Sequence, residues 1–448
     1  MGLFDRLRGD DGPRVAFLGI DGVPWSLIAD NPERFPNLTA LAEEGAGGPM
    51  RSIVPPESSA CWPALTTGTN PGKTGVYGFQ DREVGSYDTY VPMGNDVQST
   101  RLWARVDEAG RDATVMNVPV TFPPDREPTR MVSGFLSPSV EKAALPESFA
   151  ADLESMGYRI DVNAKLGHEE DKTAFIEDAH ETLDARTAAF EKYLAEDDWD
   201  LFFGVFMTTD RVNHFLFEHY ERDGEYQEAF LDFYESVDES LGSIRDSLPE
   251  DTTMVVASDH GFTTLDYEVH LNAWLEQEGW LSYATDEPED LADIDSETTA
   301  YSFIPGRFYV NLEGREPRGS VPESEYEQVR AELTDALESL TGPEGRSVID
   351  RVVPKEDAFS GAHDDIGPDL VAIPNDGFDL KSGFSGHGEV FGTGPRNGMH
   401  TFDEATLLID DPEITIPPET DLLDITPTIL DLLEIDVDAG EFDGESLA

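Results

Sequence analysis

Short apolar runs alternate with longer amphipathic segments along most of this chain. Strands are expected at residues 14–20, 113–118, 201–207 and 253–257, and helices at residues 101–109, 171–194 and 227–248. Runs that are apolar at nearly every position are typical of strands buried on both faces of a parallel sheet. The alternation therefore predicts an α/β fold with a doubly wound, mostly parallel sheet flanked by helices.

The pattern changes between residues 283 and 347, where an acidic stretch precedes the run Phe308–Leu312 and a helix expected at residues 323–340. We expect this segment to form an inserted cap. The catalytic core would then comprise residues 12–282 and 348–448, with the main sheet resuming at residues 369–373. A strand at residues 405–409 and a helix at residues 425–433 would complete it.

The charge of the chain is far from that of an ordinary globular protein. Asp and Glu number 93 against 30 Lys and Arg, which gives a formal net charge of -63. Because 39% of the residues are hydrophobic and form clear runs, a folded core with a surface adapted to high salt, as in halophiles, is expected rather than disorder. Basic residues are too sparse to bind a nucleic acid polymer, whereas a small phosphate ester bound by local metals remains possible.

The single cysteine, Cys61, excludes an internal disulfide and a cysteine-based zinc cage. Metal ligands would have to be histidines and carboxylates. The polar N-terminus contains no apolar targeting segment, and no stretch reaches the ~20 apolar residues of a membrane span. We therefore expect a cytoplasmic protein without an integral membrane segment, and the sequence leaves its oligomeric state open.

Acidic residues and histidines follow several of the expected strands. These candidate metal ligands are Asp21, Asp210, His214, Asp259, His260 and His400. Each alone could be a turn residue or a helix cap. Because the carboxyl ends of parallel strands collect functional groups at one edge of a sheet, we expect the six to lie together.

The candidate nucleophile is Ser58, which follows Pro55 and Pro56 and precedes an expected helix. A helix N-terminus favours phosphate, and a bound cation can activate a serine hydroxyl without a catalytic histidine. Ser59 is the alternative nucleophile. Both serines could instead cap the helix.

The order and spacing of these motifs resemble the alkaline phosphatase superfamily, in particular its type I phosphodiesterase and nucleotide pyrophosphatase branch. The motifs are Gly19–Gly22, Pro56–Ser58, Thr67–Lys73, Asn117–Pro119, Asp210–His214, Ser258–Gly261, Asn311–Pro317, Gly398–His400 and Asp424–Thr428. Ser58 lies nine residues before Thr67, where this family carries its nucleophile.

The resemblance implies two divalent metal ions. One would be bound by Asp210, His214 and His400, and the other by Asp21, Asp259, His260 and the Ser58 oxygen. Zinc suits this mixture of ligands, and manganese or magnesium is the alternative.

Two positions depart from the family pattern. Phe79 stands 21 residues after Ser58, where the nucleotide pyrophosphatases carry an asparagine that contacts a phosphoryl oxygen. Thr74 replaces the usual histidine of the Asn-Pro-Gly-Lys-His-Gly segment. A nucleotide substrate is therefore not implied.

The formylglycine signature of sulfatases is absent, because Cys61 is followed by Trp-Pro-Ala. His387, which lies between two glycines, is a candidate substrate contact outside the metal set.

The sequence thus predicts a metal-dependent phosphoric ester hydrolase of the phosphodiesterase type that acts through a covalent phosphoseryl intermediate on Ser58. Hydrolysis of phosphomonoesters, or transfer of a phosphoryl or head group to an alcohol, is the alternative chemistry on the same site. A non-catalytic scaffold stabilised by metal is the alternative outside enzymes.

Overall fold

Strand β1 (Arg14–Ile20) lies in the middle of an eight-stranded sheet and is buried along its whole length. Its alternate side chains enter two different apolar cores, with Leu18 on one face of the sheet and Phe17 on the other. A strand with this environment must be apolar at nearly every position, as its sequence is. The computed structural model describes residues 12–196, 198–286, 288–383 and 388–448.

The strand order of the main sheet is β2-β19-β9-β1-β8-β5-β6-β7. The other strands are β2 (Ala46–Met50), β5 (Ala113–Val118), β6 (Arg130–Ser133), β7 (Ala144–Leu145), β8 (Leu201–Phe206), β9 (Thr252–Ala257) and β19 (Ala405–Ile409). The central pairs β9-β1, β1-β8, β8-β5 and β5-β6 are parallel, and the edge pairs are antiparallel. The predicted fold class is confirmed.

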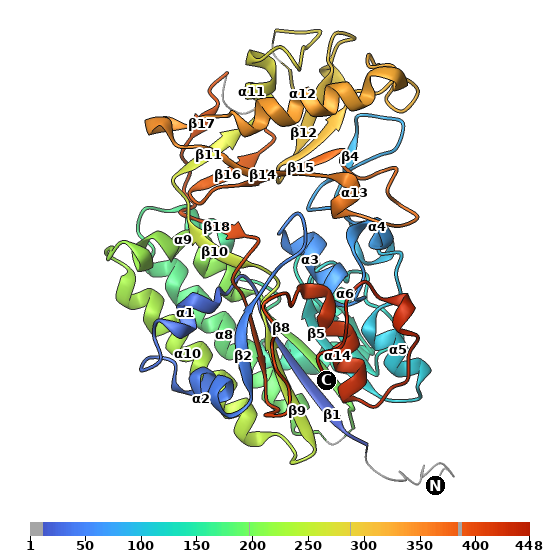
Figure 1. Cartoon of the computed structure of the whole chain (residues 1–448). Helices are drawn as coiled ribbons and strands as arrows, with labels where there is room; N and C mark the ends of the chain where they lie inside the picture. The colour runs from blue at the N-terminus through green and yellow to red at the C-terminus, as the bar shows by residue number, and fades with distance from the viewer. Residues whose placement is uncertain (1–11, 197, 287, 384–387) are drawn as a thin grey trace.

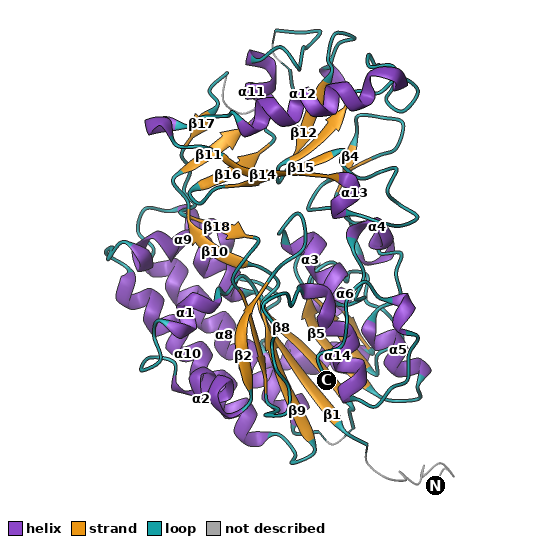
Figure 2. Cartoon of the chain, in the orientation of Figure 1, coloured by secondary structure: helices purple, strands orange, loops and turns teal. Residues whose placement is uncertain are grey.

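Helices cover both faces of this sheet (Figures 1 and 2). One face is covered by α2 (Pro36–Glu44), α7 (Glu147–Met156), α8 (Thr173–Leu194), α9 (Thr208–Glu221) and α10 (Gln227–Ser247). The other face is covered by α3 (Ser58–Leu65), α5 (Leu102–Glu108) and α14 (Ile425–Leu432). Short helices α1 (Trp25–Ala29), α4 (Pro71–Thr74) and α6 (Val140–Ala143) lie in the connections. Within the described residues, no helix is long and apolar enough to cross a membrane.

A second lobe lies beyond the carboxyl ends of the central strands (Figure 1). Its four-stranded sheet has the order β12-β13-β15-β14, formed by Ala300–Phe303, Arg307–Val310, Leu370–Pro374 and Ile349–Pro354. A three-stranded sheet, β16-β11-β17, joins Phe378–Lys381, Tyr267–His270 and Phe391–Gly392. Helices α11 (Leu271–Gln277), α12 (Tyr326–Glu338) and α13 (Lys355–Ala358) and the hairpin of β3 (Asp81–Arg82) and β4 (Thr89–Tyr90) complete the lobe.

The expectation that the main sheet resumes at residues 369–373 is wrong. That run forms β15, which pairs with β13 and β14 in the second lobe. Residues on both sides of 283–347, such as Trp274 and Leu380, belong to the apolar core of this lobe. A short apolar run has the same appearance in either sheet, so its sequence does not specify which sheet it joins.

Candidate active site

The candidate ligands follow three adjacent strands of the main sheet. Asp21 comes directly after β1, and Asp259 follows β9 with one residue between them. Asp210 lies in the first turn of α9, which begins two residues after β8 ends. Since β9, β1 and β8 are neighbours and parallel, all three carboxylates are delivered to one edge of the sheet. All three are almost completely buried.

Two histidines are brought together by a small antiparallel pair of strands, β10 (Gly261–Thr264) and β18 (Gly398–Thr401). His260 immediately precedes β10, and His400 lies on β18 opposite Phe262. The rings of His260 and His400 are stacked, with centroids 3.7 Å apart. His214 lies one turn after Asp210 on α9, as predicted, and its Nε2 is 3.1 Å from Nε2 of His400.

The three imidazoles have the same orientation of their ring nitrogens. In each, Nδ1 is hydrogen-bonded to a backbone carbonyl, that of Gly398 for His214, Gly261 for His260 and Pro56 for His400. A carbonyl oxygen can only accept, so Nδ1 carries a proton and Nε2 is the nitrogen that faces the site. This arrangement is the usual one for histidines that bind metal ions.

Ser58 is the first residue of α3. Its Oγ lies 3.1 Å from Nε2 of His260 and 3.4 Å from Oδ1 of Asp21. The other oxygen of Asp21 accepts a 2.7 Å hydrogen bond from Nε1 of Trp62, one turn further along α3. Among the hydrogen bonds between described residues, the Ser59 hydroxyl has no such contact with the ligand set. The hydroxyl of Ser58 is thus the one that lies among the ligands.

The side chains form two groups that could each hold a cation. The potential ligand atoms of Asp21, Asp259 and His260 lie within 4.8 Å of one another, and so do those of Asp210, His260 and His400. Nε2 of His214 is 3.4 Å from Oδ1 of Asp210, which places it beside the second group. His260 therefore belongs to both groups, whereas the prediction from the sequence assigned it to one metal ion only.

Two buried carboxylate oxygens support metal binding here. Oδ1 of Asp210 and Oδ2 of Asp259 lack a well-formed hydrogen bond among the described residues, and their nearest neighbours are imidazole Nε2 atoms at 3.3–3.4 Å. A buried, unpaired carboxylate oxygen is costly, and a divalent cation would satisfy it. Cations would likewise separate the two converging Nε2 atoms of His214 and His400. The donor set therefore fits divalent metal ions.

Residues 15–403 match the family model of type I phosphodiesterases and nucleotide pyrophosphatases. The chain belongs to this family. Its fold and family are those of phosphoryl hydrolases, in agreement with the resemblance seen in the sequence. A comparison with curated protein sequences found no match.

Solved structures of this family's fold align over almost the whole chain. Phosphonoacetate hydrolase from Sinorhizobium meliloti, in complex with phosphonoacetate, has a TM-score of 0.63 at 15% identity, over 95% of each chain. The alkaline phosphatase PafA has a TM-score of 0.60 at 14% identity, over 98% of this chain and 99% of its own. Murine ectonucleotide pyrophosphatase/phosphodiesterase 5, in complex with AMP, has a TM-score of 0.57 at 14% identity, over 95% and 96%. At these identities the alignments establish the fold alone.

The electrostatics of the candidate site also favour cations. Burial, together with the charges of Asp259 and Asp210, raises the pKa of Asp21 well above its ordinary value. Burial and the charge of Asp210 raise the pKa of Asp259 to about 8. Burial lowers the pKa of His214 and of His260, which keeps both imidazoles neutral. The metal-free site thus has more carboxylates than it can keep ionised.

Asp210 behaves differently from the other two carboxylates. Burial would raise its pKa, but the neighbouring His214 and His400 and the guanidinium of Arg211 outweigh this effect and hold the pKa well below its ordinary value. The same contact raises the pKa of His400 against the opposing effect of burial. Of the three carboxylates in the metal-free site, Asp210 is therefore the one that stays ionised.

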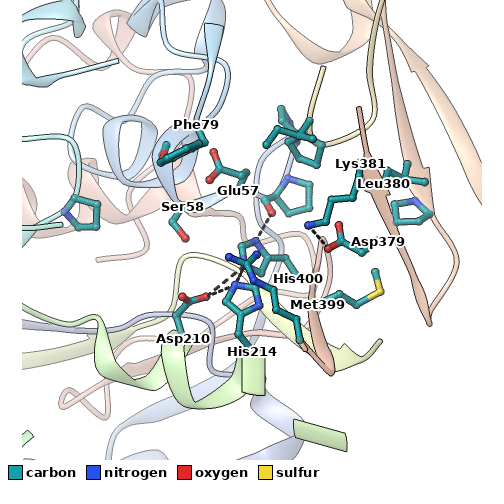
Figure 3. Close-up of a pocket in the computed structure, with 18 of the residues that line it drawn as sticks. Glu57, Ser58, Phe79, Asp210, His214, Asp379, Leu380, Lys381, Met399 and His400 are labelled. Carbon is teal, nitrogen blue, oxygen red and sulfur yellow. Dashed lines mark hydrogen bonds and ion pairs between the residues drawn. The ribbon is translucent and has the colours of Figure 1, made fainter. Parts of the chain in front are cut away.

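A cavity opens between the two lobes onto Ser58, Asp210, His214 and His400 (Figure 3). Its walls are largely apolar and include Phe79, Phe135, Pro119, Ile304, Pro305, Leu380 and Met399. Lys381, which pairs with Asp379, also lines it. The lobe that carries Leu380 and Lys381 therefore contributes the wall opposite the nucleophile.

Some functional side chains were not found by sequence reasoning. Trp62 could have been recognised from its spacing of four residues after Ser58, which places both on one helical face. No local signal marks Phe135 or Arg211, which reach the cavity through contacts across the fold. Thr74 is buried in α4 with its hydroxyl 3.5 Å from the carbonyl oxygen of Pro71, and it does not line this cavity. His387 lies outside the described residues.

Proposed function

We propose that this chain is a two-metal phosphoric ester hydrolase that uses Ser58 as its nucleophile. The observation that supports this most directly is the position of Ser58 Oγ, within 3.4 Å of both Asp21 and His260 and on the wall of a substrate-sized cavity. A serine that only capped α3 would need neither of these neighbours. The same ligand set without Ser58 would suit the alternative of a metal-stabilised scaffold.

The proposed ligands divide into two sets. Asp21, Asp259, His260 and the Ser58 oxygen would hold one ion, and Asp210, His214 and His400 the other, with His260 placed between them. Zinc suits this mixture of imidazole and carboxylate best, with manganese or magnesium as alternatives. Bound divalent ions would lower the pKa of the Ser58 hydroxyl and neutralise charge that develops on the phosphoryl oxygens.

In the proposed reaction, Oγ of Ser58 forms a bond to phosphorus while the bond to the leaving-group oxygen breaks, and the alcohol that leaves carries away the proton that the serine hydroxyl loses. The product is a phosphoserine, which retains the second ester group if the substrate is a diester. Water then forms a bond to phosphorus, the bond to Ser58 breaks, and the serine regains its proton. The positions of Asp21 and His260 orient the hydroxyl for the first step.

The Ser58→Ala variant tests this proposal. Purified in high salt with zinc, it should lose hydrolysis of a nitrophenyl phosphodiester by at least ~10³-fold, because the covalent route requires the hydroxyl. Zinc measured by mass spectrometry should remain bound through the six other ligands. Ser59→Ala is the matched control, since the Ser59 hydroxyl makes no hydrogen bond to the candidate ligands among the described residues, and it should keep most of the activity. Undiminished turnover by Ser58→Ala would exclude the assignment.

The ester class is the second question for the same assay. The three structural relatives are named as a phosphonoacetate hydrolase, a nucleotide pyrophosphatase/phosphodiesterase and an alkaline phosphatase. The fold therefore does not decide which class of ester this chain hydrolyses. We propose a phosphodiester as the first candidate, with phosphomonoesters or transfer to an alcohol as alternatives. Rates on matched nitrophenyl mono- and diesters, and transfer products formed with added glycerol, would distinguish the three.

We also propose that the protein works in concentrated salt. The support is its net charge of -63, which a halophile's cytosol would screen.

A further inference from the structure

Phe79, which stands where the pyrophosphatases carry their phosphate-binding asparagine, belongs to an aromatic pair on the cavity wall. Its ring stacks on that of Phe135, with centroids 6.2 Å apart and the planes inclined by 28°. The guanidinium of Arg211 lies over Phe135, 4.5 Å from its centroid. All three side chains line the cavity that opens onto Ser58. Phe79 therefore helps to build an aromatic platform on which Arg211 lies.

Arg211 is held rigidly at this position. Its Nη2 donates to Oδ2 of Asp161 at 3.0 Å, its Nε donates to the same carboxylate, and its Nη1 donates to Oδ2 of Asp210 at 3.2 Å. The side chain is only 11% exposed. The contact with Asp210 uses the oxygen opposite the one that faces His214 and His400.

These contacts leave part of the guanidinium available. A guanidinium carries five N–H groups. The hydrogen bonds to described residues use one on Nε, one on Nη1 and one on Nη2. One N–H therefore remains on each terminal nitrogen, and two such donors in one plane match two oxygens of a phosphoryl group.

We propose that Arg211 binds the non-bridging oxygens of the phosphoryl group. This inference rests on the proposed function. A fixed cation at the cavity wall would stabilise the charge of the transferred group without reorganisation. Asp161 and Phe135 would be positioning residues that fix the guanidinium.

The test compares Arg211→Ala with Arg130→Ala as a matched control. Arg130 also has two carboxylate partners, Asp198 and Glu196, and lies over an aromatic ring, that of Tyr193, but it does not line the cavity. With quantified zinc, Arg211→Ala should lower kcat/KM about 10²–10³-fold, as loss of an oxyanion donor does. It should also weaken binding of inorganic phosphate measured by calorimetry. Added guanidinium at low concentration should restore part of the activity in Arg211→Ala and none in Arg130→Ala.

Asp161→Asn provides a second variant if Arg211→Ala loses its metal. It keeps the guanidinium but loosens it, and should weaken phosphate binding at unchanged zinc content. Wild-type affinity for phosphate in both variants would overturn the assignment of Arg211 alone. Absence of any ester hydrolysis by the wild-type protein would instead overturn the proposed function.

Discussion

At the scale of single residues, the site brings three buried carboxyl groups together. Asp21, Asp210 and Asp259 are almost completely buried at one edge of the sheet, and among the described residues Arg211 is the only arginine or lysine that hydrogen-bonds to any of them. Nε1 of Trp62 and the backbone N–H of Gly22 are neutral donors to Asp21 and Asp259. Such a cluster is compatible with folding only if protons or metal ions neutralise it.

The stability of the metal-free protein should therefore depend on Asp259. Its pKa of about 8 in the folded state exceeds the value of about 3.9 expected in the unfolded chain. Between these values the folded state binds more protons, so the free energy of unfolding should fall as the pH rises from about 4 to about 8. Denaturant titrations at a series of pH values in high salt would measure this slope.

Asp259→Asn is the control for this prediction, because it removes the titrating group with little change in shape. The metal-free variant should show a flatter dependence on pH, and zinc should flatten the dependence of the wild type in the same way. An equal slope in the metal-free wild type and the metal-free variant would contradict the prediction.

At the scale of elements, the pairing of β10 with β18 is what places His260 beside His400. Gly261 lies opposite Thr401 in this pair, and a Cβ added at Gly261 would clash with the backbone oxygen of Asp403 and the hydroxyl of Thr401. The two strands thus approach more closely than any side chain at this position allows. Their spacing is a condition for the shared ligand group.

Gly261→Ala should therefore push β18 away from β10. We expect a loss of about 1–3 kcal/mol in the free energy of unfolding, the usual effect of overpacking, and weaker zinc retention against a chelator. Gly48→Ala is the control, since the nearest atom to an added Cβ there is 3.8 Å away. Unchanged zinc retention in Gly261→Ala would show that this spacing does not control the site.

The elements could be predicted where burial on both faces forces a continuous apolar run. The expected strand at residues 113–118 coincides with β5, and those expected at 14–20 and 405–409 coincide with β1 and β19. The assignment of β15 to the main sheet was wrong because strand partners are chosen by long-range packing, which a local run does not encode. For the same reason Arg211 and Phe135 were not found. Asp21, Asp210 and Asp259 could be read from their positions after strands, whereas His400, which lies within β18, was identified as a ligand through the resemblance to the family.

At the scale of the whole molecule, the 30 basic side chains are far fewer than the 93 acidic ones, so several carboxylates surround one basic group. Arg34, for example, lies within ion-pair distance of three carboxylates, those of Glu228, Asp232 and Glu235. With a net charge of -63, the folded chain repels itself, and repulsion over a surface weakens as salt shortens the screening length from ~10 Å at 0.1 M to ~3 Å at 1 M.

The melting temperature should therefore rise steeply as potassium chloride is increased from about 0.1 to about 1 M, the range in which screening changes most. Differential scanning fluorimetry measures this. Sucrose, which strengthens burial without screening charge, is the control and should have a smaller effect. A melting temperature that stays constant or falls with salt would contradict an adaptation to high salt.

Apart from the β3–β4 hairpin, the second lobe leaves the main body after β10 and returns to it at β18, and these two strands pair with each other. Residues 265–397 thus form a single long excursion whose two ends are held in register by that pairing. Closing a longer excursion costs only slightly more chain entropy than closing a shorter one. The lobe could thus be lengthened, shortened or replaced while His260 and His400 stay facing each other, so the substrate wall can diversify independently of the metal ligands.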